Sequence, residues 1–143
     1  MNSRAATKED YSSLSEIWAQ SVSATHTFLH PADFLEIQKN LSIYFEGVTV
    51  KVWVVDEEII GFTGTSGEHL EMLFLSPKVF RKGFGRQIVE RLIAHEGITS
   101  VDVNEQNTGA VSFYESLGFE MIARDALDGQ GKAYPILHLK KID

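Results

Sequence analysis

The sequence contains no cysteine in its 143 residues. Disulfide bonds, thiolate zinc sites and a cysteine nucleophile for covalent catalysis are therefore excluded. No apolar run approaches the ~20 residues that a membrane-spanning helix needs, and the polar start, Met-Asn-Ser-Arg, lacks the apolar core of a signal peptide. We expect a cytoplasmic protein with no membrane partner, because a reducing compartment also fits the absence of cysteine.

Basic residues are few relative to acidic ones. The 13 lysines and arginines are outnumbered by 20 aspartates and glutamates, which gives a formal net charge of −7. We expect no nucleic-acid partner, because such binding needs a basic face. An acidic protein weakly favours a cationic substrate such as an amine. The length and the 43% apolar content fit one domain, residues 1–143, around one core.

The hydrophobic spacing alternates along the chain between helical and strand-like periods. Apolar residues between Leu14 and Val22 recur at helical spacing, whereas residues 48–55 are rich in the β-branched side chains typical of a strand. The expected helices open at Thr7, run between His30 and Gly47, and cover residues 85–95 and 107–117; the expected strands are 2–6, 48–55, 59–65, 70–75, 99–103, 119–126 and 135–140. This order predicts an α+β fold, a mixed sheet with helices on its faces.

A glycine-rich basic loop, Arg-Lys-Gly-Phe-Gly-Arg at residues 81–86, lies between a predicted strand and a predicted helix. Glycine lets the backbone approach a ligand closely, and the free N–H groups and dipole of a helix start attract anions. We therefore expect a pyrophosphate site. A Walker loop would need Gly-Lys-Ser/Thr where Arg86-Gln87 stands, and a dinucleotide fingerprint would need a small residue at Ile88. A plain surface loop with a glycine cap is the alternative without function.

The segment after the predicted strand 99–103 narrows this choice. Residues 107–119, Asn-Thr-Gly-Ala-Val-Ser-Phe-Tyr-Glu-Ser-Leu-Gly-Phe, resemble the Asn-x-x-Ala-x-x-Phe-Tyr-x-x-x-Gly-Phe segment of the GCN5-related N-acetyltransferase (GNAT) superfamily. The glycine loop resembles that family's Gly-x-Gly/Ala motif, with Arg81 and residues 83–86 in register. The resemblance covers nearly the whole chain and implies a mixed, mostly antiparallel sheet of six or seven strands with about four helices on its faces.

Three further segments are similar to a bacterial subgroup of that superfamily. They are Ser-Val-x-Ala-Thr-His-x-Phe-Leu at 21–29, Val-Asn-Glu-Gln-Asn at 103–107, and Gly-Lys-x-Tyr-Pro-Ile-Leu at 131–137. Ala133 stands where the Lys-Pro-Tyr-Pro run of the subgroup has proline. This difference leaves the conformation of the local turn undecided, but it does not affect the resemblance to the family.

The resemblance implies acetyl-CoA as cosubstrate, with no metal. It places pantetheine along the predicted strand 70–75, the acetyl carbonyl at the N–H of Leu75, and the pyrophosphate at the glycine loop. The implied cofactor-binding residues are Leu73, Phe74, Leu75, Arg81, Lys82, Gly83, Phe84, Gly85, Arg86, Asn107, Ala110 and Tyr114.

Acetyl transfer to an amine needs a base for the amine and an acid for the leaving thiolate. Tyr114 can donate its hydroxyl proton to the sulfur, or it can be a core residue beside Phe113. Glu71 is the candidate base, or a solvated strand carboxylate. Strand alternation turns Glu71 away from Leu70 and Met72 unless a bulge re-aims it.

The acceptor site is expected around His26, Phe28 and Tyr134, because the region between the first two helices covers this site in the family. His69 is also expected at the acceptor site, as an alternative base, and His26 can instead be a packed or capping histidine. His26 and His30 have a metal-ligand spacing, but Pro31 breaks the helix and no third ligand is near, so no metal is expected.

The sequence thus predicts an N-acetyltransferase that moves an acetyl group from acetyl-CoA directly to an amine of a small molecule or peptide. The alternatives are a non-catalytic CoA or acyl-CoA sensor or interaction module, and a nucleotide-binding protein. A homodimer is expected only by analogy with similar folds.

Overall fold

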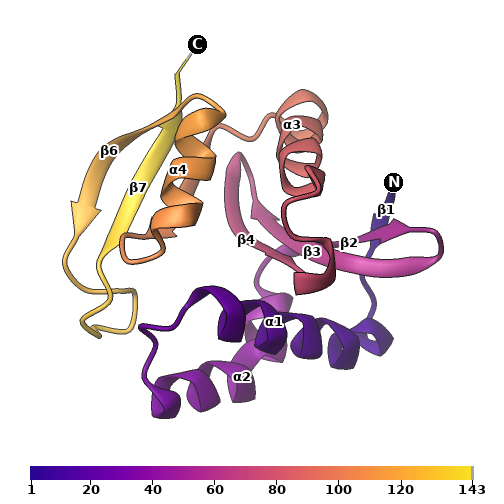
Figure 1. The fold of residues 1–143 in the computed structure, drawn as a ribbon, viewed down its shortest axis with the longest axis horizontal. Helices are drawn as coiled ribbons and strands as arrows, with labels where there is room; N and C mark the ends of the chain where they lie inside the picture. Colours follow the sequence, from indigo (N-terminus) through magenta and orange to yellow (C-terminus); the bar gives the residue numbers. More distant parts are fainter. Residues whose placement is uncertain (143) are drawn as a thin grey trace.

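A computed structural model describes residues 1–142 and contains a seven-stranded sheet in the order β1-β2-β3-β4-β5-β7-β6, with helices on both faces (Figure 1). The strands are β1 (Asn2–Ala5), β2 (Thr49–Val55), β3 (Glu58–Ser66), β4 (His69–Leu75), β5 (Ser100–Asn104), β6 (Phe119–Asp125) and β7 (Ile136–Lys141); the helices are α1 (Tyr11–Thr25), α2 (Pro31–Glu46), α3 (Phe84–Glu96) and α4 (Thr108–Ser116), with 3-10 turns η1 (Lys8–Asp10) and η2 (Pro77–Val79). The predicted order of elements and the mixed, mostly antiparallel sheet are confirmed. One detail differs: the capping box at Thr7 opens η1, and α1 begins after it.

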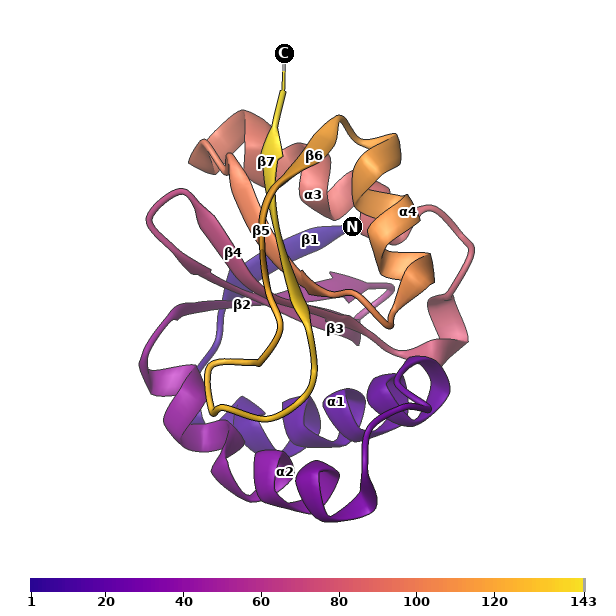
Figure 2. The ribbon, with the colours of Figure 1, turned by 90° about the vertical axis from the view of Figure 1, so that its left-hand side faces the viewer.

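Apolar side chains divide into two clusters because the sheet separates two helical layers. Helices α1 and α2 cover one face, where Leu14, Phe45 and Phe62 are fully buried. Helices α3 and α4 cover the other, where Ile88 and Phe119 are buried (Figure 2). Among residues 1–142, no helix combines the length and the apolar character needed to cross a membrane.

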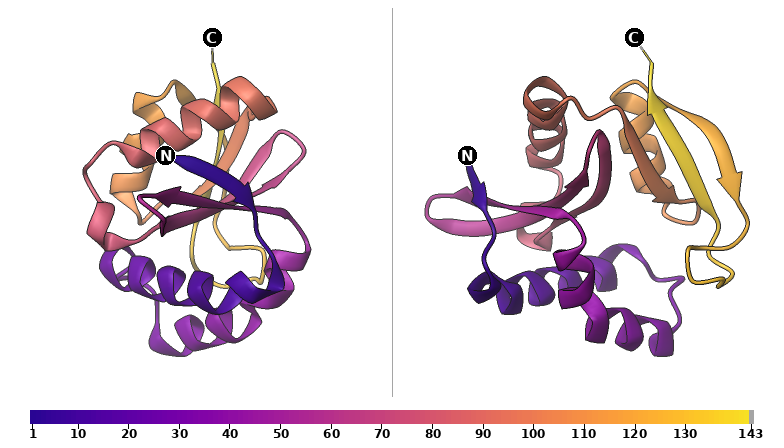
Figure 3. Two further views of the ribbon diagram at one scale, coloured as in Figure 1. Left: turned by 90° about the vertical axis from the view of Figure 1, so that its right-hand side faces the viewer. Right: turned by 180° about the vertical axis from the view of Figure 1, so that it is seen from behind.

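Strands β4 and β5 are parallel neighbours that pair over a very short stretch. Their register contains only His69↔Ser100 and Leu70↔Val101. Beyond Leu70 the two halves of the sheet diverge (Figure 3). The C-terminal part of β4 therefore has a strand partner on its β3 side and none on its β5 side.

A β-bulge interrupts the pairing of β4 with β3. Gly64 pairs with Met72, and the next residue, Thr65, pairs with Leu70. Glu71 is the extra residue of this bulge, and a bulge of this kind re-aims the side chain that it carries.

Candidate functional site

Two cavities open on β4 and share part of their walls. The α4-side cavity, of about 670 Å³, is lined by Ser21, Ala24, Thr25, His26, Leu73, Phe74, Leu75, Val79, Phe80, Arg81, Gly83, Phe84, Gly85, Arg86, Asn107, Gly109, Ala110, Phe113 and Tyr114. The α2-side cavity, of about 510 Å³, is lined by Trp18, Val22, His26, Phe28, Leu29, Ile37, Leu41, Ile43, Tyr44, Gly47, Val48, Glu71, Met72, Phe74, Asn104, Asp128, Tyr134 and Ile136. His26 and Phe74 belong to both walls. Ligands in the two cavities would therefore meet beside these two residues.

The backbone of β4 offers unpaired polar groups to the α4-side cavity. The N–H of Ser76 donates to the carbonyl of Ile60 at 2.7 Å. Hydrogen-bonded and non-hydrogen-bonded pairs alternate along an antiparallel ladder, so Phe74 is bonded to β3 while Leu73 and Leu75 direct their N–H and C=O groups toward the gap. An extended ligand can pair with these two residues like an added strand. Phe74 borders the cavity with its side chain rather than with free backbone groups, which corrects the expectation for this residue.

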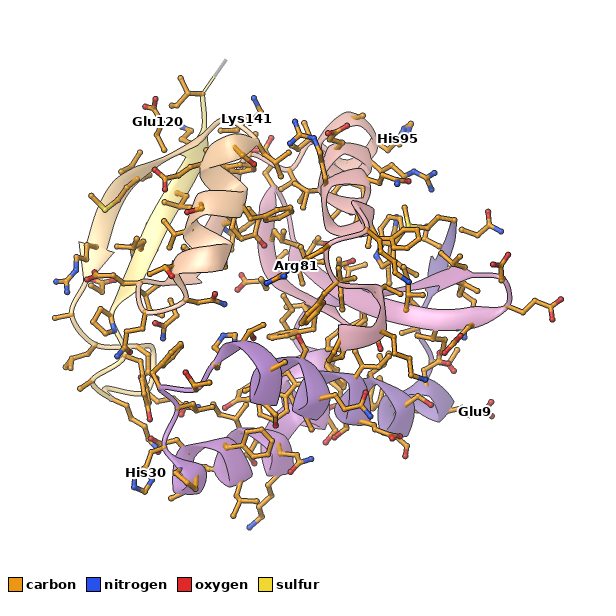
Figure 4. All side chains as sticks on the ribbon, viewed as in Figure 1. Glu9, His30, Arg81, His95, Glu120 and Lys141 are labelled. Carbon is orange, nitrogen blue, oxygen red and sulfur yellow. The ribbon has the colours of Figure 1, made fainter. Side chains whose placement is uncertain are left out.

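The glycine loop begins α3 at the other end of the same cavity. Arg81 has φ 62° and Gly83 has φ 83°, so the loop turns through two left-handed residues. The first helical bond runs from the N–H of Gln87 to the carbonyl of Gly83 at 3.2 Å, which leaves the preceding N–H groups without helical partners. Figure 4 shows Arg81 in the space bordered by α1, α3 and α4. This arrangement of N–H groups and guanidinium suits an anion such as a pyrophosphate.

One member of the loop, Lys82, differs from the expectation. Lys82 does not line the cavity, unlike Arg81 and Arg86. Arg86 also forms an ion pair with Glu90 at 2.8 Å, which offsets part of its charge. A Cβ at Gly85 would lie in ordinary van der Waals contact with the ring of Phe113, at 3.4 Å.

Tyr114 of α4 both packs in the core and faces the α4-side cavity. Its residue is 7% exposed, and its ring lies 5.8 Å from that of Phe119. Burial raises the pKa of the Tyr114 phenol, so the hydroxyl keeps its proton at neutral pH and can act as a donor. Within residues 1–142 this hydroxyl has no hydrogen-bond partner. The two readings of Tyr114, core residue and site residue, are therefore compatible.

Asn107 and Ala110 line the same cavity at the start of α4. The Asn107 side-chain oxygen caps the helix by accepting the N–H of Ala110 at 3.1 Å. The cap fixes the helix start next to the cavity, so both residues lie where the sequence motif led us to expect them.

Glu71 is an exposed acidic side chain in the mostly apolar wall of the α2-side cavity. It reaches this wall because it is the bulged residue of β4. It makes no ion pair within the part of the chain that the structure describes. A carboxylate in this setting can accept a proton from, or pair with, a cationic group entering the cavity.

An aromatic row crosses the α2-side cavity toward the shared wall. The ring centroids of Tyr134 and Phe28 are 6.2 Å apart, and those of Phe28 and His26 are 5.2 Å apart. His26 ends α1, and its Nδ1 lies 2.7 Å from the hydroxyl of Thr25. Burial lowers the pKa of His26, which favours the neutral imidazole at the meeting point of the cavities.

Two histidines of the sequence prediction lie elsewhere. His69 lines neither cavity: its Nδ1 is 2.7 Å from Ser100 Oγ and its Nε2 is 3.3 Å from Asp102 Oδ2. The structure therefore does not bring His69 to the acceptor cavity, in contrast to the expectation. His30 caps α2 by accepting the N–H of Ala32, and no group of three or more acidic, histidine or cysteine side chains in residues 1–142 is arranged to hold a metal ion.

Sequence reasoning missed several lining residues. Thr25 and Ala24 belong to the 21–29 segment that was already singled out, so that motif could have indicated them. Asn104 likewise belongs to the 103–107 segment quoted above, whereas Asp128 reaches the α2-side cavity only through the path of the β6–β7 loop.

Comparison with known proteins gives consistent results. Residues 13–131 match the family model of the acetyltransferase (GNAT) domain. The chain is 38% identical over 140 residues to the peptidyl-lysine N-acetyltransferase YjaB of Salmonella typhimurium, covering 97% of both proteins. The solution structure of apo-form YjaB from Escherichia coli superposes with a TM-score of 0.91 at 34% identity, over 99% of this chain and 97% of that one. PaiA N-acetyltransferase from Thermoplasma acidophilum, solved in complex with coenzyme A, shares the fold with a TM-score of 0.71 at 21% identity, over 99% and 98%.

Proposed function

Because the chain belongs to the GNAT acetyltransferase family, and is an N-acetyltransferase, we propose that it transfers the acetyl group of acetyl-CoA directly to the side-chain amine of a peptidyl lysine. The observation that carries this proposal is the meeting of two cavities at His26 and Phe74. One cavity has the polar backbone and anion site that a CoA thioester needs. The other has apolar walls that include the Glu71 carboxylate, as a lysine side chain needs.

The α4-side cavity fits acetyl-CoA. The pyrophosphate would lie at the N–H groups of residues 83–86 and the Arg81 guanidinium, with Arg86 beside it. Pantetheine would extend along the free backbone groups of Leu73 and Leu75, bordered by Asn107 and Ala110. The thioester would then lie near Tyr114 and the shared wall.

The α2-side cavity fits a lysine side chain. Its apolar wall can surround four methylene groups, and Glu71 supplies the one acidic side chain that the β4 bulge brings to the wall. The Salmonella relative described above is named a peptidyl-lysine N-acetyltransferase, which favours a protein amine over a small polyamine. The net charge of −7 also favours a basic peptide.

The reaction requires a neutral amine. A lysine amine with a pKa of about 10.4 is neutral in roughly one molecule in 2,500 at pH 7, which corresponds to about 4.6 kcal/mol. Glu71 would accept the ammonium proton, directly or through water. The amine nitrogen would attack the thioester carbon, and the Leu75 N–H would stabilise the oxyanion.

Collapse of this tetrahedral species forms the C–N bond and breaks the C–S bond. The Tyr114 hydroxyl would give its proton to the leaving sulfur, and the proton would be replaced from solvent. No acyl-enzyme is needed, and the absence of cysteine excludes one on sulfur. Bringing both substrates to one point would supply much of the rate.

The test combines binding with turnover. Coenzyme A should raise the melting temperature by mass action, whereas ATP and NAD should not. A lysine-containing peptide with a blocked N-terminus should release CoA thiol in the presence of acetyl-CoA, with the acetyl group found on lysine by mass spectrometry. Binding of coenzyme A without transfer to any peptide or amine would instead identify a CoA sensor.

The seven-stranded sheet carries residues of both cavities, so we also propose that the whole chain acts as one catalytic domain. Its location in the cytoplasm and its assembly as a homodimer stay predictions.

A further inference from the structure

We propose that Asp33 is a positioning residue for the acceptor, because it fastens the β6–β7 loop (residues 126–135) over the α2-side cavity. The inference rests on the proposed function only in naming that cavity the acceptor site. Asp33 itself lines neither cavity, so it acts through the residues that it holds.

Both carboxylate oxygens of Asp33 are bonded to the loop. Oδ1 accepts from Lys132 Nζ at 2.5 Å, and Oδ2 accepts from the hydroxyl of Tyr134. Lys132 also donates to Glu36 at 2.7 Å, and the Tyr134 oxygen accepts the backbone N–H of His30 at 3.0 Å. Figures 1 and 3 show the loop beside the α1–α2 connection. Two segments distant in sequence are thus joined at one carboxylate.

Hydrogen bonds within the β6–β7 loop fix its conformation, so holding one end of the loop also positions the other end. Asp128 Oδ1 accepts the N–H groups of Gln130 and Lys132, each at 2.9 Å. The N–H of Asp128 donates to the carbonyl of Lys132 at 2.9 Å. Gln130 reaches Tyr44 on α2 as a second tie. Asp33 is therefore bonded to a loop that is itself held together by hydrogen bonds.

The fastened residues form the aromatic side of the acceptor cavity. Tyr134 lines the cavity and stacks near Phe28, which in turn lies beside His26. Hydrogen bonds from Lys132 and Tyr134 hold the pKa of Asp33 below its ordinary value, so the carboxylate stays charged at neutral pH. The Lys132 and Asp33 side chains are 31% and 19% exposed. Ion pairs that water still reaches contribute little to folding, which points to placement of the rings as the main effect.

The test compares Asp33→Ala with Glu96→Ala. Glu96 is a matched control, because it forms a similar ion pair with Lys51 at 3.0 Å and lines neither cavity. Asp33→Ala should raise the KM for a lysine peptide at least about tenfold, because it removes both charge-assisted hydrogen bonds to the loop, and it should leave the KM for acetyl-CoA unchanged. The control should change neither value. An unchanged peptide KM in Asp33→Ala, or an equal rise in both KM values, would overturn the proposal.

A second arm separates positioning from a general defect of α2. Tyr134→Phe removes only the hydroxyl, and its effect on peptide KM should not add to that of Asp33→Ala, because both break the same link. Hydrogen exchange of the amides in residues 126–135 should accelerate in Asp33→Ala and not in the control. An unchanged exchange rate of these amides in Asp33→Ala would overturn the proposal that Asp33 fastens the loop, even if no acceptor is known. A wild-type protein that acetylates no peptide refutes the proposed function, and the exchange result then decides this inference alone.

Discussion

His69 Nδ1 lies 2.7 Å from Ser100 Oγ, at the point where β4 and β5 make their last register pairs. This side-chain contact joins the two strands at the base of the gap that holds the α4-side cavity. The sequence suggested His69 as a base, but the structure gives both of its ring nitrogens partners on β5. His69 therefore lies where β4 and β5 are still paired, and the proposed catalytic groups, Glu71 and the Leu75 N–H, lie farther along β4.

Substitution of Gly83 should weaken cofactor binding. Gly83 has φ 83° and Gly97, at the other end of α3, has φ 67°; a Cβ at either position would meet no atom within 4 Å. Alanine at either should cost about 1 kcal/mol of stability, because both must adopt a left-handed conformation. Only Gly83→Ala should weaken coenzyme A binding, measured by titration calorimetry. Equal affinity in the two variants would show that the loop does not hold the cofactor.

Loss of the Tyr114 hydroxyl should slow the chemical step. Tyr114→Phe keeps the ring packed against Phe119, so the fold and the KM for acetyl-CoA should be retained. The kcat should fall about a hundredfold or more, the usual size of general-acid catalysis. Tyr11→Phe, at a ring that packs on Phe45 outside both cavities, is the control. A kcat equal to wild type in Tyr114→Phe would remove this residue from the mechanism.

Removal of the Glu71 charge should reduce transfer to the amine without affecting the cofactor. Glu71→Gln preserves the shape of the bulged residue and eliminates its proton-accepting oxygen. We expect kcat/KM for the peptide to fall about a hundredfold, with coenzyme A binding unchanged. Glu68→Gln, just before β4 and outside both cavities, should behave as wild type. A similar loss in both variants would contradict a specific role for Glu71.

The stability of the sheet should depend on the protonation of His138. Its Nε2 and Nδ1 lie 2.6 Å from Asp125 and Asp102, so both nitrogens are donors only in the imidazolium form. These bonds raise the pKa of His138 above its ordinary 6.5. The stabilisation is therefore complete below pH 6.5 and disappears as the pH rises through the folded-state pKa.

The measurement is a series of melting temperatures from pH 5.5 upward in wild type and His138→Gln. The difference in melting temperature between wild type and His138→Gln should be largest at the acidic end and become smaller as the pH rises. His95→Gln, on α3, serves as control and should show no such trend. An advantage that grows with pH would refute this prediction.

Local patterns of the chain were sufficient for much of the fold. Apolar periodicity located the helices and strands, since helical and strand spacings differ within a few residues. The glycine loop indicated an anion site, because helix starts and left-handed turns are encoded by adjacent residues. The Asn107–Phe119 segment indicated coenzyme A only through its resemblance to the family. Arg81, Tyr114 and Asn107 line one cavity, and their roles toward the cofactor stay predictions.

The sequence by itself therefore determined the order of elements, the cofactor loop and the family resemblance. Only the tertiary structure decided that Glu71 enters a cavity, since a bulge depends on the pairing of β4 with β3. Only it assigned His69 to Ser100 and joined Asp33 to Tyr134. Such contacts depend on strand register and on loops that meet across the fold, and neither is set by residues that are neighbours in the sequence.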